Sequence, residues 1–139
     1  MKLGNSEILK ISLRKLFPFI IMFSFYIVSY GTSYPGGGFQ AGVVAGTLVV
    51  IYGVIFDREH FNDKFYKIIE FITLICFLLL VIFGIVFYSN LFLWITVIQK
   101  DSLIFSNVFF FFMNFLIFFE VNSSIILIFR NIIKGYQDE

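Results

Sequence analysis

Glu120 is the acidic residue that stands out in the long apolar runs of this sequence. It precedes Arg130 by ten residues, which is about 15 Å along a helix and places its carboxyl group near the middle of a bilayer. Ser123 and Ser124 follow at three and four residues, so both hydroxyl groups are expected on the same helix face and within hydrogen-bonding reach. A carboxyl group at that depth is neutral, paired or on a hydrated pathway. Two hypotheses stay open: Glu120 binds a proton or cation on an ion path, or it is a protonated acid that hydrogen-bonds a neighbouring helix.

Amide side chains form a second polar stripe in the same apolar run. Asn107, Asn114 and Asn122 follow one another at spacings of seven and eight residues. A helix with two polar stripes is not expected to face lipid on all sides, which makes Asn114 a further candidate for the ion path. Gln40, at the start of an earlier apolar run, is either an interfacial hydrogen-bonding group or part of a polar path.

The other titratable groups have structural interpretations. Glu70 lies three residues after Lys67, about 4.5 Å into a helix, and is expected to snorkel or pair at the cytoplasmic face. Cys76 is a lone cysteine in an apolar run, and His60 lies in a charged loop. The sequence has no metal-ligand cluster, no nucleophile–base pair and no phosphate-binding loop, so it predicts no metal, no cofactor and no enzyme activity. It has no basic patch for nucleic acid either.

The elements that position these groups are membrane-spanning helices. Of the 139 residues, 60% are apolar and only 14% are charged, which is too little polar surface for a soluble domain of this size. The apolar runs do not alternate with polar residues, which argues against a β-barrel. We therefore predict an all-α integral membrane protein, a single domain over 1–139 with four transmembrane helices. The predicted spans are 12–30, 38–56, 68–88 and 103–129.

The basic residues predict the orientation of the chain. If the N-terminus is inside, nine of the ten lysines and arginines lie on the inner side, and only Lys100 lies outside. Basic residues are concentrated on the cytoplasmic side of membrane proteins. Both termini are therefore predicted to be cytoplasmic.

A glycine-rich turn connects the first two predicted helices. Pro35 fixes its own φ, while Gly36 and Gly37 leave the backbone free, so very few residues can join two antiparallel helices. The turn also leaves backbone N–H groups open at the start of the second helix. These groups can bind an anion or a neighbouring carbonyl group; the alternative is a tight turn that lets another helix approach.

Glycines continue along the second predicted helix. Gly38, Gly42 and Gly46 are four residues apart and Gly53 follows seven residues later, so they lie near one face. Small residues at this spacing allow close helix packing in lipid. We expect this face to pack against another helix, either in the same chain or in a partner.

The turn also carries a family resemblance. Residues 31–42 are Gly-Thr-Ser-Tyr-Pro-Gly-Gly-Gly-Phe-Gln-Ala-Gly. This segment, including Phe39, resembles the signature of the MrpB-type (also called MnhB-type) subunit of the multi-subunit Mrp/Mnh cation/proton antiporters, approximately Gly-His-x-x-Pro-Gly-Gly-Gly-Phe-Gln-Gly-Gly. Thr32 stands where the family often has His, and Ala41 stands where it often has Gly. The fourth helix of the family often opens with Phe-Asp-x-Gly-Val, but Ser106 replaces that Asp here, so any role of the Asp is not carried over.

The resemblance implies an accessory, non-catalytic subunit of a sodium/proton antiport module, multi-pass in the cell inner membrane. Such a subunit would contribute to ion translocation and subunit packing. Its partners would be other membrane subunits of an antiporter or of a related membrane-bound hydrogenase-type complex. The residues also fit a different class, a self-contained small transporter or channel that forms homo-oligomers through the glycine face. Co-purification with several different membrane subunits would favour the first interpretation, and a single species the second.

Overall fold

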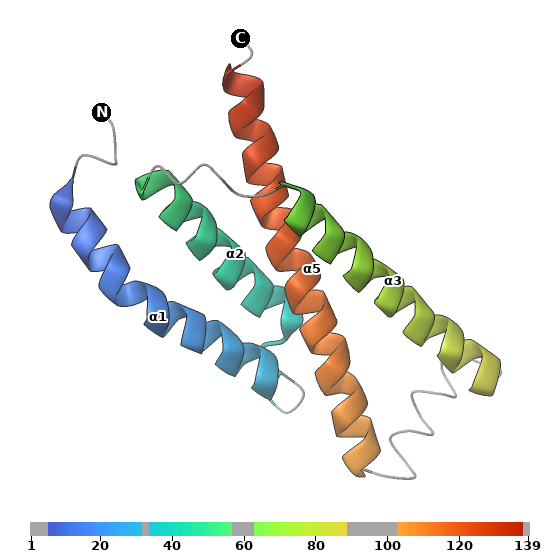
Figure 1. Cartoon of the computed structure of the whole chain (residues 1–139). Coiled ribbons are helices and arrows are strands. Elements are labelled where there is room, and N and C mark those ends of the chain that lie inside the picture. The colour runs from blue at the N-terminus through green and yellow to red at the C-terminus, as the bar shows by residue number, and fades with distance from the viewer. Residues whose placement is uncertain (1–5, 32–33, 57–62, 89–102, 138–139) are drawn as a thin grey trace.

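A computed structural model describes residues 6–31, 34–56, 63–88 and 103–137 of the chain. The described residues form four helices and no strand: α1 (Glu7–Tyr30), α2 (Gly38–Ile55), α3 (Asp63–Tyr88) and α5 (Leu103–Gln137) (Figure 1). All four are long and apolar enough to cross a membrane, which confirms the predicted all-α membrane fold. The predicted loop position of His60 and the predicted outer position of Lys100 lie outside the described residues.

Three helices extend beyond the apolar runs that predicted them. α1 begins at Glu7 rather than at residue 12, α3 begins at Asp63 rather than at residue 68, and α5 continues to Gln137 rather than ending at residue 129. Hydropathy marks the part of a helix that lies in lipid, whereas backbone hydrogen bonding continues into the polar flanks. At the start of α1, for example, the Ser6 hydroxyl accepts a hydrogen bond from the N–H of Leu9 at 3.4 Å and caps the helix.

The helices are arranged in a row in which α5 has the most neighbours. α1 packs on α2, α2 packs most extensively on α5, and α1 also touches α5. Among the described elements, α3 contacts α5 alone. α1 begins and α5 ends at the same end of the molecule, called here the N/C end, and the glycine turn that joins α1 to α2 lies at the opposite end, called here the turn end (Figure 1).

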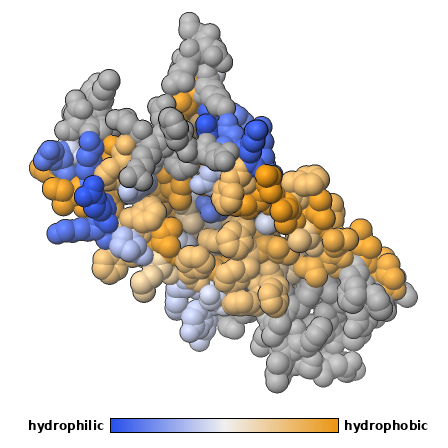
Figure 2. Space-filling model, in the orientation of Figure 1, coloured by the Kyte–Doolittle hydropathy of each residue, from blue (hydrophilic) through white to orange (hydrophobic). Residues whose placement is uncertain are grey.

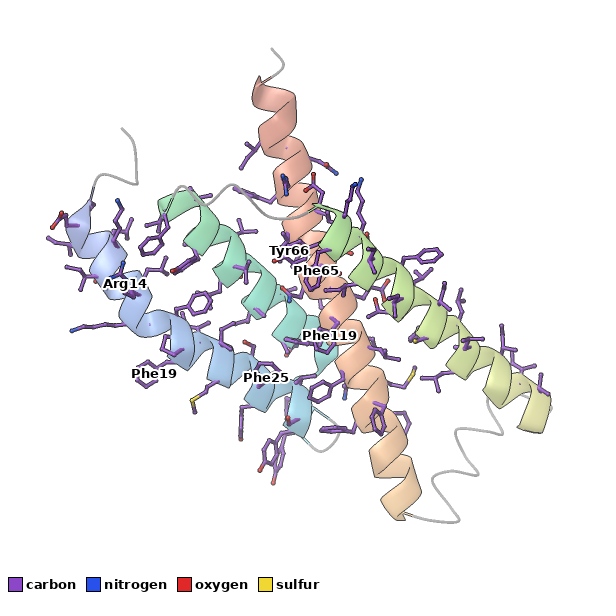
Figure 3. All side chains as sticks on the ribbon, viewed as in Figure 1. Arg14, Phe19, Phe25, Phe65, Tyr66 and Phe119 are labelled. Atoms are coloured by element: carbon purple, nitrogen blue, oxygen red, sulfur yellow. The ribbon has the colours of Figure 1, made fainter. Side chains whose placement is uncertain are left out.

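Close packing within the chain is concentrated where α1, α2 and α5 meet. Val28, Ala41, Ala45 and Phe118 form the buried cluster there. Phe25 of α1 lies toward α5 (Figure 3), with its ring centroid 5.5 Å from that of Phe118. The two small alanines allow α1 and α5 to approach α2.

Most of the outer surface of the four helices is apolar. Figure 2 shows hydrophobic side chains over the middle of the molecule, while hydrophilic residues gather at the N/C end, over the starts of α1 and α3. Phe19, for example, is 69% exposed and points away from α2 and α5 (Figure 3). Such a surface suits lipid or the apolar helices of other subunits, because neither requires polar groups on it.

Candidate functional site

The turn between α1 and α2 depends on glycine backbone geometry. Gly36 and Gly37 have φ values of 150° and 133°, which side-chain-bearing residues rarely adopt. A Cβ atom at Gly31 would overlap the backbone of Gly37, so the end of α1 and the start of α2 are in direct backbone contact. Three glycines therefore let the chain reverse within a few residues, as the sequence predicted.

A side chain of α5 caps the N-terminus of α2. The residue before α2 is Gly37, which has no side chain to cap the helix. The Oδ1 atom of Asn114 accepts a hydrogen bond from the N–H of Gly38 at 3.2 Å and takes that role from across the interface. Of the ligands predicted for this site, the structure thus shows a neighbouring carbonyl group. A role of Asn114 on an ion path stays a prediction.

The glycine face of α2 packs on the backbone of α5. A Cβ atom at Gly38 would overlap the backbone of α5, one at Gly42 would lie 2.9 Å from a carbonyl oxygen, and one at Gly46 would lie 3.2 Å from another. Any of these side chains would therefore press on backbone that cannot rotate out of the way. The carbonyl groups concerned are those of Asn114, Phe118 and Asn122.

The partner of the glycine face is thus a helix of the same chain. Gly53, farther along α2, is buried as well. Because α5 covers this face, it is not free to join copies of the chain, as the homo-oligomeric alternative required. The sequence predicted that the face would be covered but left the covering helix open.

The hydroxyl groups predicted to lie beside the carboxyl group of Glu120 have other acceptors. Ser123 is buried and donates to the backbone carbonyls of Phe119 at 2.8 Å and Glu120 at 2.9 Å. Ser124 donates instead to Oε1 of Glu70 on α3 at 2.7 Å. Neither hydroxyl group donates to the carboxyl group of Glu120 in the described structure, and the ion-path roles of Glu120, Ser123 and Ser124 stay predictions. A serine on a transmembrane helix can satisfy its hydroxyl group on the preceding turn or on a neighbouring helix, and spacing alone does not choose between them.

Glu70 makes a contact between helices that its position in the sequence did not predict. Its half-buried carboxyl group accepts a hydrogen bond from α5 and does not behave as a group that only snorkels to the surface. Thr73, three residues later, is buried and is bonded to the backbone of its own helix. Two polar residues three apart in the apolar part of α3 that follows Lys67 mark one face. That spacing was the available signal for the side of α3 that faces α5.

Charged contacts lie toward the N/C end of the same interface. Arg130 of α5 pairs with Asp63 of α3 at 2.5 Å, and both side chains are about three-quarters buried, with relative exposures of 24% and 27%. On the other side of the molecule, the guanidinium group of Arg14 lies 5.5 Å from the ring centroid of Phe56. Polar contacts therefore tie α3 to α5, and a cation–π contact ties α1 to the end of α2.

The other candidate residues lie apart from these contacts. Gln40, Phe39 and Pro35 are exposed near the turn end. Glu120 is half-buried, and the Oδ1 atom of Asn122 is buried without a hydrogen bond in the described structure. Within the part of the chain that the structure describes, no three His, Cys, Asp or Glu residues are grouped to hold a metal ion.

The fold and its interfaces define a multi-pass helical membrane protein with one helix pair in backbone contact and another joined through a carboxyl group. A family model described as "Domain related to MnhB subunit of Na+/H+ antiporter" matches residues 8–127, and the chain belongs to this family. The match confirms the resemblance carried by the glycine turn and extends it into α5. Searches of curated proteins and of solved structures gave no match.

Proposed function

We propose that the chain is an accessory membrane subunit of a sodium/proton antiporter assembly, located in the inner membrane with both termini in the cytoplasm. The observation that carries the proposal is the family match over residues 8–127, which reaches from the start of α1 far into α5. Nine of ten basic residues on one side support the orientation. The host is either a stand-alone antiporter or a hydrogenase-type complex with a related module.

The packing supports a role in holding subunits together. α2 and α5 form a close pair through the glycine face, while α1 and α3 present mostly apolar outer faces. A close internal pair keeps its shape when neighbours pack around it, because helix contacts through backbone leave little freedom to slide. Such a unit can present fixed surfaces to larger subunits.

If the chain contributes to ion translocation, the groups that take part are expected to be carboxyl groups at membrane depth. Among the described residues, Glu70 and Glu120 lie within spanning helices and away from the helix ends. For Glu120, the substitution Glu120→Gln in an assembled complex is expected to abolish or shift the pH dependence of antiport. Unchanged antiport by a normally assembled complex would contradict a role of Glu120 on the ion path.

Gentle purification tests the proposed function directly. A tag on this chain, extraction of the membranes in a mild detergent and mass spectrometry of everything that co-purifies should reveal large antiporter-type subunits. Additional iron–sulfur and hydrogenase-like proteins would identify a redox-driven host, and their absence a stand-alone antiporter. Recovery of this chain as a single species would contradict the proposal and favour a self-contained transporter.

A further inference from the structure

We propose that the carboxyl group of Glu70, together with the hydroxyl group of Ser124, is a proton-binding site on the path between the N/C end and the interior of the membrane. The inference rests on the proposed function, because it assigns a working group to a subunit of a proton-coupled assembly. It gives a working role to a residue for which the sequence alone predicts a structural one.

The contact itself can exist in either charge state of the acid. Ser124 donates to Oε1 of Glu70 at 2.7 Å across the α3–α5 interface. A serine hydroxyl group both donates and accepts hydrogen bonds, so it can also accept from the O–H of a protonated carboxyl group. The side chain of Arg130 only donates, and its ion pair with Asp63 favours one charge state. With serine as the partner, the carboxyl group of Glu70 can therefore gain or lose a proton and keep its hydrogen bond in both states.

The position of Glu70 places it inside the membrane but close to the N/C end. It lies seven residues after Asp63, which corresponds to about 10 Å along α3. Ser124 lies six residues before Arg130, about 9 Å along α5. Both halves of the contact are thus at the same depth, between one and two helix turns inside the ion pair.

Charged and titratable groups lie on both sides of Glu70 along the proposed proton path, some nearer the N/C end and one nearer the membrane interior. Its own helix carries the ion-paired Asp63, the half-buried Tyr66 and the exposed Lys67, all nearer the N/C end. The packed neighbour α5 carries Arg130 in the ion pair and, four residues before Ser124, Glu120. Residues four apart share a helix face, so Glu120 is the next acid on that face toward the interior.

Modification by dicyclohexylcarbodiimide tests the proposal in membranes that contain the intact assembly. The O–H of a protonated carboxyl group adds across one C=N bond of the reagent: the proton goes to nitrogen and the carboxyl oxygen bonds to the central carbon. The acyl group then moves from oxygen to nitrogen, giving a stable N-acylurea without a leaving group. The reagent can reach α3 through lipid, because this helix exposes Phe71, Ile72 and Leu74.

Glu70 should carry the adduct at acidic pH and lose most of it, several-fold, at alkaline pH, as measured by mass spectrometry of the isolated chain. Absence of the adduct at every pH, or an adduct that does not vary with pH, would overturn the proposal. Because the native chain is used, this result does not depend on whether a variant folds.

Variants connect the labelling to transport. Glu70→Gln should abolish the adduct at this position and change the pH profile of antiport in assembled complexes. Ser124→Ala should also change the profile, and Ser124→Thr should restore it. The matched control is Thr47→Val, which removes an exposed hydroxyl group on α2 that bonds only its own helix backbone at 2.7 and 3.1 Å. An unchanged profile for both Glu70→Gln and Ser124→Ala would overturn the proposal.

The two proposals fail in different ways. Co-purification of antiporter-type subunits together with unlabelled Glu70 would contradict only the proposed proton-binding role. Recovery of the chain alone would contradict the proposed antiporter assembly, whether or not Glu70 is labelled.

Discussion

The two interfaces of α5 differ in the kind of contact that forms them. Toward α2, glycines bring helix backbones together and leave no space for a methyl group. Toward α3, contact is made through side chains, with an ion pair at the N/C end and a serine–carboxyl hydrogen bond farther in. The first interface is specified by shape, and the second by groups whose charge can change.

The difference indicates which part of the chain can respond to pH. Contacts between backbone atoms do not titrate, so the α2–α5 pair should keep its geometry over a wide pH range. The contacts of α3 with α5 involve two carboxyl groups of α3, those of Asp63 and Glu70, and α3 touches no other described helix. The ionisable contacts within this helix pairing therefore lie between α3 and α5, whereas the α2–α5 contact is made by backbone atoms.

The largest expected effect comes from adding a methyl group to the glycine face. Gly38→Ala would place a Cβ atom on the backbone of Asn114, so α2 and α5 must separate along the interface. Overpacking a tight interior costs about 1–3 kcal/mol, and here no side chain can move aside. We expect loss of most folded protein, measured as the yield of monodisperse chain in detergent and as its melting temperature.

Gly135→Ala is the matched control for that change. It lies on α5 as well, but a Cβ atom there has nothing within 4 Å. Its yield and melting temperature should equal those of the unmodified chain or slightly exceed them, because alanine favours the helix. Equal stability of the two variants would contradict the close packing of α2 on α5.

Asn114→Ala tests the cap across the same interface. The N–H of Gly38 would lose its acceptor, and loss of a helix cap typically costs about 1 kcal/mol. We expect a lower melting temperature in detergent, with a decrease smaller than that of Gly38→Ala. Asn114→Asp keeps an acceptor oxygen at the same place and should recover most of the stability. If the two variants are equally destabilised, the side-chain oxygen of Asn114 is not the important group.

The α3–α5 interface should tolerate substitution better. Side-chain hydrogen bonds between membrane helices contribute about 0.6 kcal/mol on average and at most about 1.7 kcal/mol. A double-mutant cycle of Ser124→Ala and Glu70→Ala in unfolding experiments should give a coupling energy in that range, because each substitution removes the hydrogen bond. The same substitutions combined with Asn114→Ala should be additive, because that contact belongs to the other interface. Coupling between the two interfaces would show that α3 and α2 do not attach independently.

The sequence was informative where a residue type restricts the backbone and less so where a side chain chooses among partners. Glycines at intervals of four predicted a closely packed face of α2, because small residues at this spacing allow another helix to approach closely. They could not identify α5 as the neighbour, since that depends on how the helices are arranged in space. The hydroxyl group of a serine in a helix can bond a backbone carbonyl group of its own helix or a group on a neighbouring helix, and only the tertiary structure places Glu70 beside Ser124.

The smallest expected effect is that of the ion pair at the N/C end. Asp63 and Arg130 are each about a quarter exposed, and pairs in contact with water contribute about 0–1 kcal/mol. Asp63→Asn should therefore lower the melting temperature only slightly, and added salt should reduce the difference from the unmodified chain. Exchanging the two residues, Asp63→Arg with Arg130→Asp, should recover stability if their attraction is what holds the start of α3. A large, salt-independent loss in Asp63→Asn would instead show that this end of α3 is held by shape, as α2 is, and the contrast between the two interfaces would no longer hold.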